Sequence, residues 1–339
     1  MGTLPSTDER RTVFVIHPGA LGDVLLALPA LRNIRRQWPG RSMGLLARDD
    51  IALLLLQCGE VEQAFPWSDN LLALLYAGPA SAPQPVVDWL ARCDVAVAWL
   101  SSGQEELQRS LLAMGARRVL SGSPHDSGLK SRHQQDRFGE AVGLADPHLR
   151  SSDPLRLPES LNQEGRRLLE SVGLDPRDDL VAVHPGSGSR HKCLPSSRLA
   201  ELIGAMRLQG CRPFLIGGPA DHQALHDLVT EMSSEVPVVR DHPIGTIAGV
   251  LRQASLFVGH DSGLTHLAAW LHCRTVAAFG PTDPSRWAPR GPLISIIRGL
   301  ECLCEDWATV TGCRSKPCLS LSVQELLESC LYAMERSER

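Results

Sequence analysis

The chain has 339 residues, a formal net charge of −4 and an ordinary apolar content of 43%. That length is enough for two hydrophobic cores. The slightly acidic balance is unlike the basic surface of a nucleic-acid-binding domain, so no nucleic-acid partner is expected. The longest apolar runs, such as 24–31 and 71–77, are too short to cross a bilayer. Residues 1–11 are polar and lack the apolar core of a secretory signal, which predicts a disordered leader.

Two halves of the chain open in the same way. Each begins with an apolar strand that ends in His-Pro-Gly, followed by a turn of small residues and then a helical pattern. The strand and helix are residues 12–17 and 24–37 in the first half, and 180–184 and 195–209 in the second. This repetition predicts two strand–turn–helix units, each at the start of a parallel α/β domain.

The remaining predicted elements alternate between short apolar strands and helices. Continuous apolar strands are typical of parallel sheets that are covered on both faces. Residues 79–85 are predicted to form a loop. The further strands are 42–47, 94–100, 118–121, 212–217, 236–240, 256–259, 275–279 and 293–297; the further helices are 104–114, 163–172, 220–233, 244–253 and 263–272.

The predicted fold class is therefore α/β, with two Rossmann-like doubly wound domains that face a central cleft. We expect the first domain at 12–150, a linker rich in Pro, Asp and Ser at 151–179, the second domain at 180–322 and a final helix within 323–339. Ligands of such folds bind at the carboxyl ends of the strands. Both His-Pro-Gly turns are expected to face the cleft.

The turn "HPGSGSRHKCLP" at 184–195 has the composition of a diphosphate-binding loop. Its small residues allow close backbone approach and expose N–H groups, and Lys192 adds a positive charge. The spacing differs from that of a P-loop. An ordinary Gly/Ser loop remains the alternative. The candidate residues here are Gly186, Ser187, Gly188, Ser189 and Lys192.

The stretch "VGHDSGLTHLAAWLHC" at 258–273 predicts a strand, a turn and a helix that begins near Gly263. Either Asp261 or Ser262 can cap that helix. The free N–H groups at its start then offer an anion site at the positive helix end. Asp261 as a helix cap only is the alternative. The candidate donor residues are Asp261, Ser262, Gly263, Leu264, Thr265 and His266.

Two further turns follow predicted strands. Thr282 and Asp283, within "FGPTDP", are candidates to contact a sugar or ribose hydroxyl. Gly217 and Asp221, within "IGGPADH", form the other turn. Asp221 either hydrogen-bonds a ribose or caps the next helix.

The first turn, "GALGD", carries a carboxylate where a phosphate-binding turn would avoid negative charge. No strand in the chain is followed by Gly-x-Gly-x-x-Gly with a partner acid about twenty residues on, which argues against a dehydrogenase. A carboxylate at a cleft-facing turn suits a general base. Asp23 is therefore the predicted catalytic base, with Gly19 and Gly22 beside the acceptor.

Together these motifs resemble glycosyltransferase family 9, the ADP-heptose:lipopolysaccharide heptosyltransferases and their relatives. The matching segments are "GALGDVLLALPALRNIRR", "HPGSGSRHKCLP", "IGGPADH", "HDSGLTHLAAWL" and "FGPTDPSRWAPRG", in the family's order. The resemblance implies a GT-B fold with an N-terminal acceptor domain and a C-terminal nucleotide-sugar domain. It also implies inverting, metal-independent transfer, and a final helix, 323–335, that packs back on the first domain.

The resemblance places the family's catalytic aspartate on Asp23. It places the phosphate-binding positions on Ser187, Ser189 and Lys192, and the donor-phosphate stretch on residues 261–266. An inverting transferase needs a base for the acceptor hydroxyl and a stabilised leaving group. Lys192, counted as catalytic, and the helix start at Gly263 would serve that leaving group.

The implied donor is a nucleotide sugar, ADP-L-glycero-D-manno-heptose, and the implied acceptor is a lipopolysaccharide or lipid A-core type glycan. No cofactor and no metal are expected. We expect a cytoplasmic monomer with at most peripheral contact with the inner face of the inner membrane. Two alternatives stay open: a nucleotide-sugar epimerase-like enzyme, and a non-catalytic sugar-nucleotide binder on the same fold. An epimerase would need no acceptor base, so Asp23 argues against it.

A basic stretch at 116–138 lies in the predicted acceptor half and would suit a phosphorylated glycan. A solvated, ion-paired loop and helix start is the equal alternative. The candidate acceptor residues are Arg117, Arg118, Lys130, Arg132, His133 and Arg137.

The chain has ten cysteines. Four of them, Cys302, Cys304, Cys313 and Cys318, lie close in sequence. Their Cys-x-Cys start is tighter than the usual zinc-ligand spacing. Reduced thiols or a local disulfide are therefore preferred to a structural metal.

Overall fold

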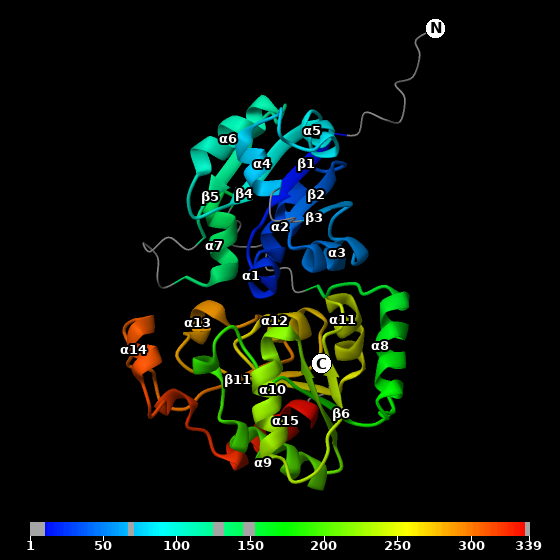
Figure 1. Ribbon diagram of the computed structural model, residues 1–339, viewed down its shortest axis with the longest axis vertical. Helices are drawn as coiled ribbons and strands as arrows, with labels where there is room; N and C mark the ends of the chain where they lie inside the picture. The colour runs from blue at the N-terminus through cyan, green and yellow to red at the C-terminus, as the bar shows by residue number, and fades with distance from the viewer. Residues whose placement is uncertain (1–10, 67–70, 125–131, 145–152, 336–339) are drawn as a thin grey trace. The chain divides into compact units, whose positions relative to one another are not determined.

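The computed structural model describes residues 11–66, 71–124, 132–144 and 153–335. The chain divides by its internal contacts into two compact units, Met1–Ser151 and Ser152–Arg339. Figure 1 colours the first unit from blue to green and the second from green to red. Residues 1–10 of the expected leader and the candidate residue Lys130 lie outside the described residues.

The first unit contains a parallel sheet with the strand order β3-β2-β1-β4-β5. Its middle strand, β1, is the first in the chain, so the connections after β1 and β4 leave toward opposite sides. The strands are β1 (Thr12–Ile16), β2 (Ser42–Ala47), β3 (Gln63–Pro66), β4 (Cys93–Trp99) and β5 (Val119–Gly122), and the helices are α1 (Leu21–Leu26), α2 (Leu28–Gln37), α3 (Asp49–Gln57), α4 (Leu71–Ala77), α5 (Gln84–Leu90), α6 (Gln104–Ala113) and α7 (Gln134–Ala141).

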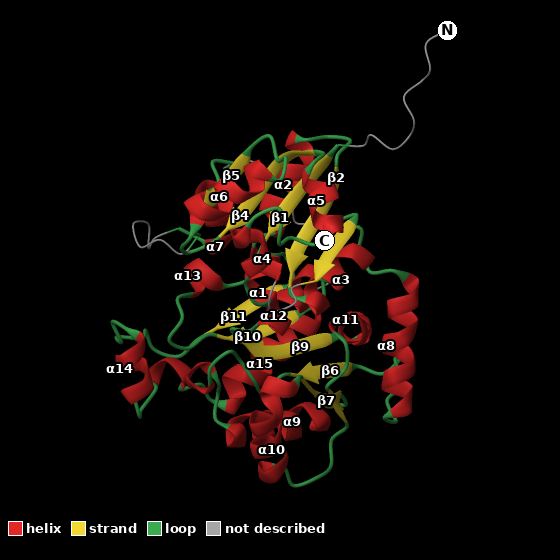
Figure 2. Cartoon of the chain, turned by 45° about the horizontal axis from the view of Figure 1, so that its top comes forward, coloured by secondary structure: helices red, strands yellow, loops and turns green. Residues whose placement is uncertain are grey.

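The second unit contains a parallel sheet with the order β11-β10-β9-β6-β7-β8. Figure 2 shows helices on both sides of the strands in each unit. The predicted α/β class with two doubly wound parallel sheets is confirmed. The elements are β6 (Leu180–Val183), β7 (Arg212–Gly217), β8 (Val238–Arg240), β9 (Leu256–His260), β10 (Thr275–Ala278), β11 (Ile294–Ile297), α8 (Glu159–Ser171), α9 (Ser196–Leu208), α10 (His222–Glu231), α11 (Ile244–Gln253), α12 (Gly263–Trp270), α13 (Pro284–Trp287), α14 (Trp307–Gly312) and α15 (Val323–Glu335), with 3₁₀ turns η2 (Arg190–Lys192), η3 (Pro219–Asp221) and η4 (Pro317–Leu319).

The predicted helix at 24–37 is two helices in the structure. The first, α1, begins at Leu21 and ends at Leu26, and α2 begins at Leu28 with Pro29 in its first turn. Proline has no N–H, and its ring collides with the carbonyl four residues earlier in a continuous helix. Pro29 therefore breaks the helical run and gives the turn after β1 its own short helix, which carries Asp23 in its first turn.

Several elements of the first unit were not predicted. The omitted ones are β3, α3, α4, α5 and α7. The apolar run at 51–56 has no polar face at helical spacing, so its pattern does not reveal α3. The predicted loop at 79–85 ends earlier, because α5 begins at Gln84. Pro85 lies in the first turn of α5, where a missing N–H costs little.

The segment that we expected as a linker contains α8, which packs along α11. Glycines let the two backbones touch: a Cβ on Gly165 would lie 2.1 Å from the carbonyl carbon of Gly249, and one on Gly249 would lie 2.0 Å from the carbonyl oxygen of Leu161. This approach leaves no room for side chains. The helix is thus part of the second unit and not a free connection.

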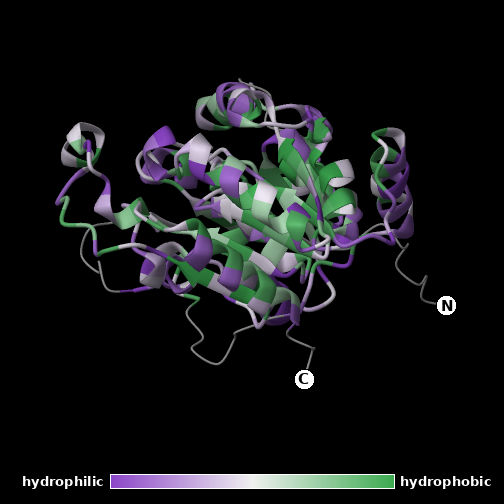
Figure 3. Ribbon diagram, turned by 90° about the horizontal axis from the view of Figure 1, so that it is seen from below, coloured by the Kyte–Doolittle hydropathy of each residue, from purple (hydrophilic) through white to green (hydrophobic). Residues whose placement is uncertain are grey.

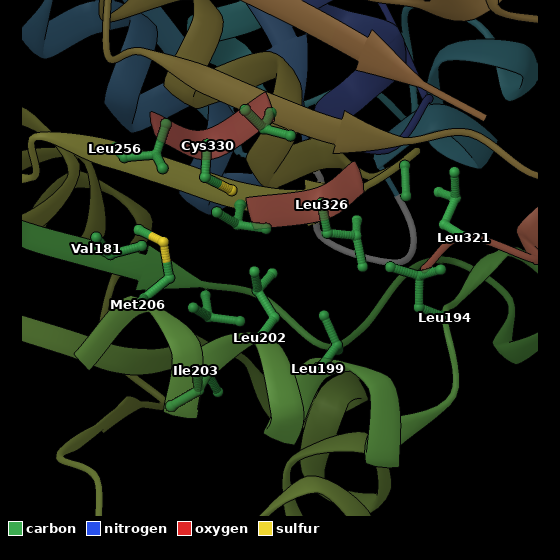
Figure 4. Close-up of a cluster of buried hydrophobic side chains, with 14 of the residues drawn as sticks. Val181, Leu194, Leu199, Leu202, Ile203, Met206, Leu256, Leu321, Leu326 and Cys330 are labelled. Atoms are coloured by element: carbon green, nitrogen blue, oxygen red, sulfur yellow. The ribbon is translucent and has the colours of Figure 1, made fainter. Parts of the chain in front are cut away.

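The core of the second unit includes α15 (Figure 4). Leu326 and Cys330, four residues apart on one helix face, are fully buried beside Leu202 and Leu256. The apolar face of this helix therefore completes the second unit's own core, and its expected packing on the first domain stays a prediction. Figure 3 colours the chain by hydropathy and shows helices that carry both apolar and polar residues. No helix in the described ranges is long and apolar enough to span a membrane.

Candidate functional site

The strand order of the second unit brings two predicted turns together. Because β6 and β9 are neighbours in the sheet, the loop after β6 and the turn after β9 meet at the same carboxyl edge. The backbone N–H of His184 donates to the carbonyl of Val258 at 2.8 Å and continues the pairing to the end of β6. Ligands of doubly wound sheets bind at such a reversal of strand order.

A buried imidazole fixes the phosphate-loop candidate to β9. The Nε2 atom of His260 accepts a hydrogen bond from the N–H of Leu194 at 3.0 Å, and its Nδ1 lies 3.3 Å from the carbonyl oxygen of Gly186. Accepting at Nε2 leaves Nδ1 as the donor. Burial, followed by the charge of His184, lowers the pKa of His260 to about 4. This neutral side chain holds both ends of the 186–194 loop.

Asp221 supports the same loop from the turn after β7. Its Oδ2 accepts from the N–H of Gly218 at 2.8 Å and lies 3.2 Å from Nε2 of His184. Burial acts to raise the pKa of Asp221, but the hydrogen bonds and charge of His184 and the N–H of Gly218 together hold it below its usual value. The side chain does not cap α10. Its bond to the Gly218 N–H completes a capping box at the start of η3, so Asp221 caps that turn, and its contact with a ribose stays a prediction.

Gly186 and Gly217 make room for this carboxylate. A Cβ on Gly186 would lie 1.8 Å from Oδ1 of Asp221, and one on Gly217 would lie 3.0 Å from its Cβ. No side chain fits at Gly186 unless the loop or Asp221 moves. The conspicuous glycine of the second His-Pro-Gly turn is therefore explained by contact with Asp221.

Lys192 and Asp261 form an ion pair across the two turns. The Nζ atom of Lys192, in η2, lies 2.7 Å from Oδ2 of Asp261, and both side chains are largely shielded from solvent. The Ser187 hydroxyl donates to the carbonyl oxygen of Asp261 at 2.5 Å. Lys192 also lies 5.9 Å from the centre of the Trp307 ring. Asp261 is therefore not the helix cap; it orients the lysine that we predict meets the phosphates.

Ser262 is the N-cap of α12. Its hydroxyl accepts from the N–H of Thr265 at 3.4 Å and lies 3.2 Å from Nδ1 of His184. Thr265 and His266 are buried, whereas Gly263 and Leu264 are half-buried. Among the described residues no hydrogen bond joins the N–H groups of Gly263 and Leu264 to an acceptor. These two groups, at the positive end of the helix, are available to an anion.

The remaining donor candidates differ in environment. Ser189 accepts from the N–H of His191 at 3.3 Å, and a Cβ on Gly188 would meet open space. Asp283 caps α13 by accepting from the N–H of Ser285 at 2.9 Å. The Thr282 hydroxyl oxygen is buried and has no hydrogen-bond partner in the part of the chain that the structure describes. Asp283 thus serves as a helix cap, and the contact of Thr282 or Asp283 with a donor hydroxyl stays a prediction.

In the first unit, Asp23 packs against the first His-Pro-Gly turn. Nδ1 of the buried His17 accepts from the N–H of Gly19 at 3.1 Å. A Cβ on Gly19 would lie 2.8 Å from Cβ of Asp23 and 2.7 Å from Cε1 of His17. Asp23 is half-buried, and Gly22 beside it lies in the same first turn of α1. The glycine turn thus holds the aspartate at the carboxyl edge of the sheet.

The basic acceptor candidates do not form one patch. Arg117 and Arg118 precede β5, so they lie at the amino edge of the sheet, about 16 Å, or five strand residues, from the turn after β1. Arg117 lies 3.5 Å from Asp94, which also binds Arg11 and Arg41. Parallel strands separate these arginines from Asp23, and their contact with the acceptor stays a prediction.

The other basic candidates surround the start of α7. Arg132 forms an ion pair with Glu140, and the His133 ring caps α7 by accepting from the N–H of Gln135 at 3.2 Å. Arg137 is buried within α7. The next residue, Phe138, packs on His17 with 5.1 Å between ring centres, so α7 lies beside the Asp23 turn. Arg132, His133 and Arg137 thus remain acceptor candidates by position.

The four clustered cysteines lie in the segment after β11. Backbone pairing of Gly299 with Cys318 at 2.9 Å folds this segment on itself. In the described ranges the cysteines are free thiols, and no three His, Cys, Asp or Glu side chains are grouped as metal ligands. Burial and then hydrogen bonding to Cys302 raise the pKa of Cys304 to about 11, whereas the Lys316 N–H lowers that of Cys313.

The sequence pattern gave no role to the His184 and His260 side chains, although both connect the loops of the second unit. The signal was present in the repeated His-Pro-Gly, because His17 occupies the equivalent position and binds Gly19. In both halves a buried histidine at the strand end holds neighbouring turns: His17 through the N–H of Gly19, and His184 through Ser262 and Asp221.

A model of glycosyltransferase family 9, the heptosyltransferases, matches residues 138–310, more than half of the chain. The chain belongs to glycosyltransferase family 9. Lipopolysaccharide heptosyltransferase 3 of Escherichia coli K12 is 22% identical over 290 residues, which cover 79% of this chain and 82% of that protein. The predicted family is confirmed, and with it a glycosyltransferase.

Solved structures of the family share the fold. A glycosyl transferase family 9 protein from Veillonella parvula superposes with a TM-score of 0.78 at 17% identity, over 96% of this chain and 98% of that one. ADP-heptose lps heptosyltransferase II of E. coli superposes with a TM-score of 0.75 at 18% identity, over 95% of this chain and 98% of that one. The two parallel sheets of this chain are accordingly the two Rossmann-like domains of the predicted GT-B fold.

Proposed function

We propose that this family 9 glycosyltransferase transfers a heptose from ADP-heptose to a lipopolysaccharide core-type glycan with inversion at the anomeric carbon. The Lys192–Asp261 pair beside the uncapped N–H groups of α12 carries this proposal. The choice of ADP-heptose follows the relative whose description includes that donor. The proposed enzyme acts as a cytoplasmic monomer and contacts the inner membrane only peripherally.

The donor diphosphate is proposed to bind between Lys192 and the start of α12. Two of the three ammonium hydrogens of Lys192 remain for phosphate oxygens while one is donated to Asp261. The N–H groups of Gly263 and Leu264 add neutral donors that need no reorientation. Such fixed donors stabilise the negative charge that develops on the departing ADP. Thr282 is proposed to meet a donor hydroxyl.

Asp23 is proposed to take the proton from the acceptor hydroxyl. An acceptor oxygen that attacks the anomeric carbon opposite the diphosphate gives inversion, and it needs one base within hydrogen-bond reach. Contact with His17 and Gly19 fixes the backbone that carries Asp23. The carboxylate is thus held in place before the acceptor binds.

Substitution of Asp23 tests this role. In Asp23→Asn we expect transfer from ADP-heptose to fall by roughly 10²–10⁴-fold, the usual contribution of a positioned base, with ADP affinity unchanged. The matched control is Asp49→Asn, which removes an exposed acid from the first turn of α3. Equal transfer by Asp23→Asn and the wild type would contradict the base assignment. Tight ADP binding without transfer to any core glycan by the wild type would favour the non-catalytic binder.

The proposed charge stabilisation requires no metal. We expect transfer to continue at its full rate in excess EDTA, because Lys192 and α12 supply the positive charge. Activity that disappears in EDTA and returns with a divalent cation would show instead that the diphosphate needs a metal.

A further inference from the structure

A cavity of about 490 Å³ lies in the second unit, on the loop that follows β6. One wall runs from Arg190 to the first turn of α9 at Arg198, and the other is the segment from Arg314 to Leu321. Lys192 does not line it, and the Lys192 ammonium group is paired with Asp261. We call this cavity the basic pocket.

The lining of the basic pocket carries a net positive charge. Its charged side chains are Arg190, Arg198, Arg314 and Lys316, and no carboxylate lines it. Arg198 is 3.0 Å from Glu201, whereas the other three form no ion pair within the described ranges. Three unpaired cations around one cavity create a local field that concentrates anions.

The same positive charges affect the pKa of the neighbouring His191. Partial desolvation, then the charges of Lys316 and Arg190, lower the pKa of His191. Two positively charged groups from separate segments therefore act on one imidazole at the edge of the pocket. Lys316 is held there with φ of +41°, a conformation that side-chain-bearing residues rarely adopt.

The floor of the basic pocket is apolar. Leu194, Leu319 and Leu321, which are 5%, 4% and 7% exposed, line the same cavity. An inorganic anion alone would leave this floor unused. A ligand that combines a phosphate group with a compact body of sugar size matches both parts, and the volume lies in the range of small-molecule sites.

We propose that the basic pocket binds an organic phosphate, with the phosphate held by Arg190, Arg314 and Lys316 and a sugar-sized body on the leucine floor. Guanidinium groups bind phosphate oxygens in pairs, which gives the site selectivity for phosphate over a single carboxylate. The phosphate has two possible sources: a free sugar phosphate or a phosphorylated residue of the acceptor glycan. The glycan source rests on the proposed transfer, whereas binding of a free sugar phosphate does not.

Calorimetric titration with glucose 6-phosphate, glucose and inorganic phosphate at constant ionic strength tests the pocket. We expect glucose 6-phosphate to bind the wild type at least ten-fold more tightly than either of the others. In Arg314→Gln/Lys316→Gln its affinity should fall at least ten-fold. The matched control is Arg156→Gln/Arg167→Gln, which removes two exposed arginines of the same unit from outside the pocket. Denaturant unfolding of both double variants checks that they are folded.

Equal affinities for the pocket variant and the control would overturn the proposal, as would equal binding of glucose and glucose 6-phosphate. Saturation with ADP should leave glucose 6-phosphate binding unchanged, whereas competition would place both ligands in one site and also overturn it. Two further arms identify the source. If the pocket variant no longer prefers a phosphorylated acceptor over the dephosphorylated one, the phosphate comes from the glycan. If the variant loses glucose 6-phosphate binding but keeps its acceptor preference, the phosphate comes from the free compound.

Discussion

Lys192 and Asp261, 69 positions apart in the chain, meet at 2.7 Å between Nζ and Oδ2. The contact joins the turn after β6 to the turn after β9 and fixes a positive charge near the start of α12. An anion that binds there uses the remaining ammonium hydrogens of a lysine that its ion pair with Asp261 already orders. This arrangement reduces the entropy lost when the donor binds.

Lys192→Gln should weaken ADP binding by roughly 10–100-fold, since a charged hydrogen bond contributes about 1.5–3 kcal/mol. Calorimetric titration with ADP measures the affinity of each variant. Lys192→Arg is the control, because it retains the positive charge. Affinity for ADP that is the same in Lys192→Gln and the wild type would remove the lysine from the donor site.

Gly249→Ala should destabilise the second unit by about 1–3 kcal/mol, the usual cost of overpacking. Its Cβ would press on the carbonyl oxygen of Leu161, which belongs to the backbone and cannot rotate away. The matched control is Gly204→Ala in α9, where a Cβ meets open space. That change should stabilise the helix by roughly 0.5–1 kcal/mol. Urea unfolding measures the stability of both variants. The same decrease in the free energy of unfolding in each variant would contradict the close α8–α11 packing.

Acidification should destabilise the second unit through His260. Its pKa of about 4 in the folded protein lies below the usual value of 6.5, so the unfolded chain binds the proton more readily. This contribution to stability is complete above pH 6.5 and is lost as the pH falls toward 4. Between pH 7 and pH 5 the loss is about 2 kcal/mol. Asp221 does not change the stability between pH 7 and pH 5. Its pKa is lowered in the folded protein, so its contribution to stability is lost only as the pH falls below the ordinary pKa of aspartate.

The pH prediction is checked by urea unfolding at pH 7 and pH 5, with an NMR titration of the His260 ring in the folded protein. The ring should remain neutral at pH 5. A ring that titrates near its ordinary value would show that the loop contacts to Leu194 and Gly186 do not hold it neutral.

Cys313 should react with iodoacetamide faster than Cys304 at pH 7.5. Hydrogen bonding to the Lys316 N–H lowers the pKa of Cys313, while desolvation and Cys302 raise that of Cys304 to about 11. The thiolate is the reactive form, so the difference in pKa becomes a difference in rate. Peptide mapping of labelled protein over time measures both positions, and equal labelling would contradict the assigned environments. Cys313→Ser provides the control for peptide assignment.

Sequence periodicity predicted both sheets, because buried parallel strands must be continuous apolar runs wherever they lie. It located β2 and β7 to the residue. It missed α3, whose leucines have no helical period, and it joined α1 to α2 across Pro29. It also gave Asp261 two roles, cap and ligand contact, because a turn's sequence does not say which of two adjacent polar residues points back at the helix. Only the structure shows that Ser262 is the cap.

The sequence by itself determined the two α/β halves, the family and the turns that carry Asp23, Lys192 and Gly263, because strand ends and small-residue turns are local features. The tertiary structure decided which distant residues meet. It paired Lys192 with Asp261, placed Asp221 against Gly186 and put Arg117 at the sheet edge away from Asp23. Strand order decides such contacts, and strand order follows from long-range packing that no local pattern encodes.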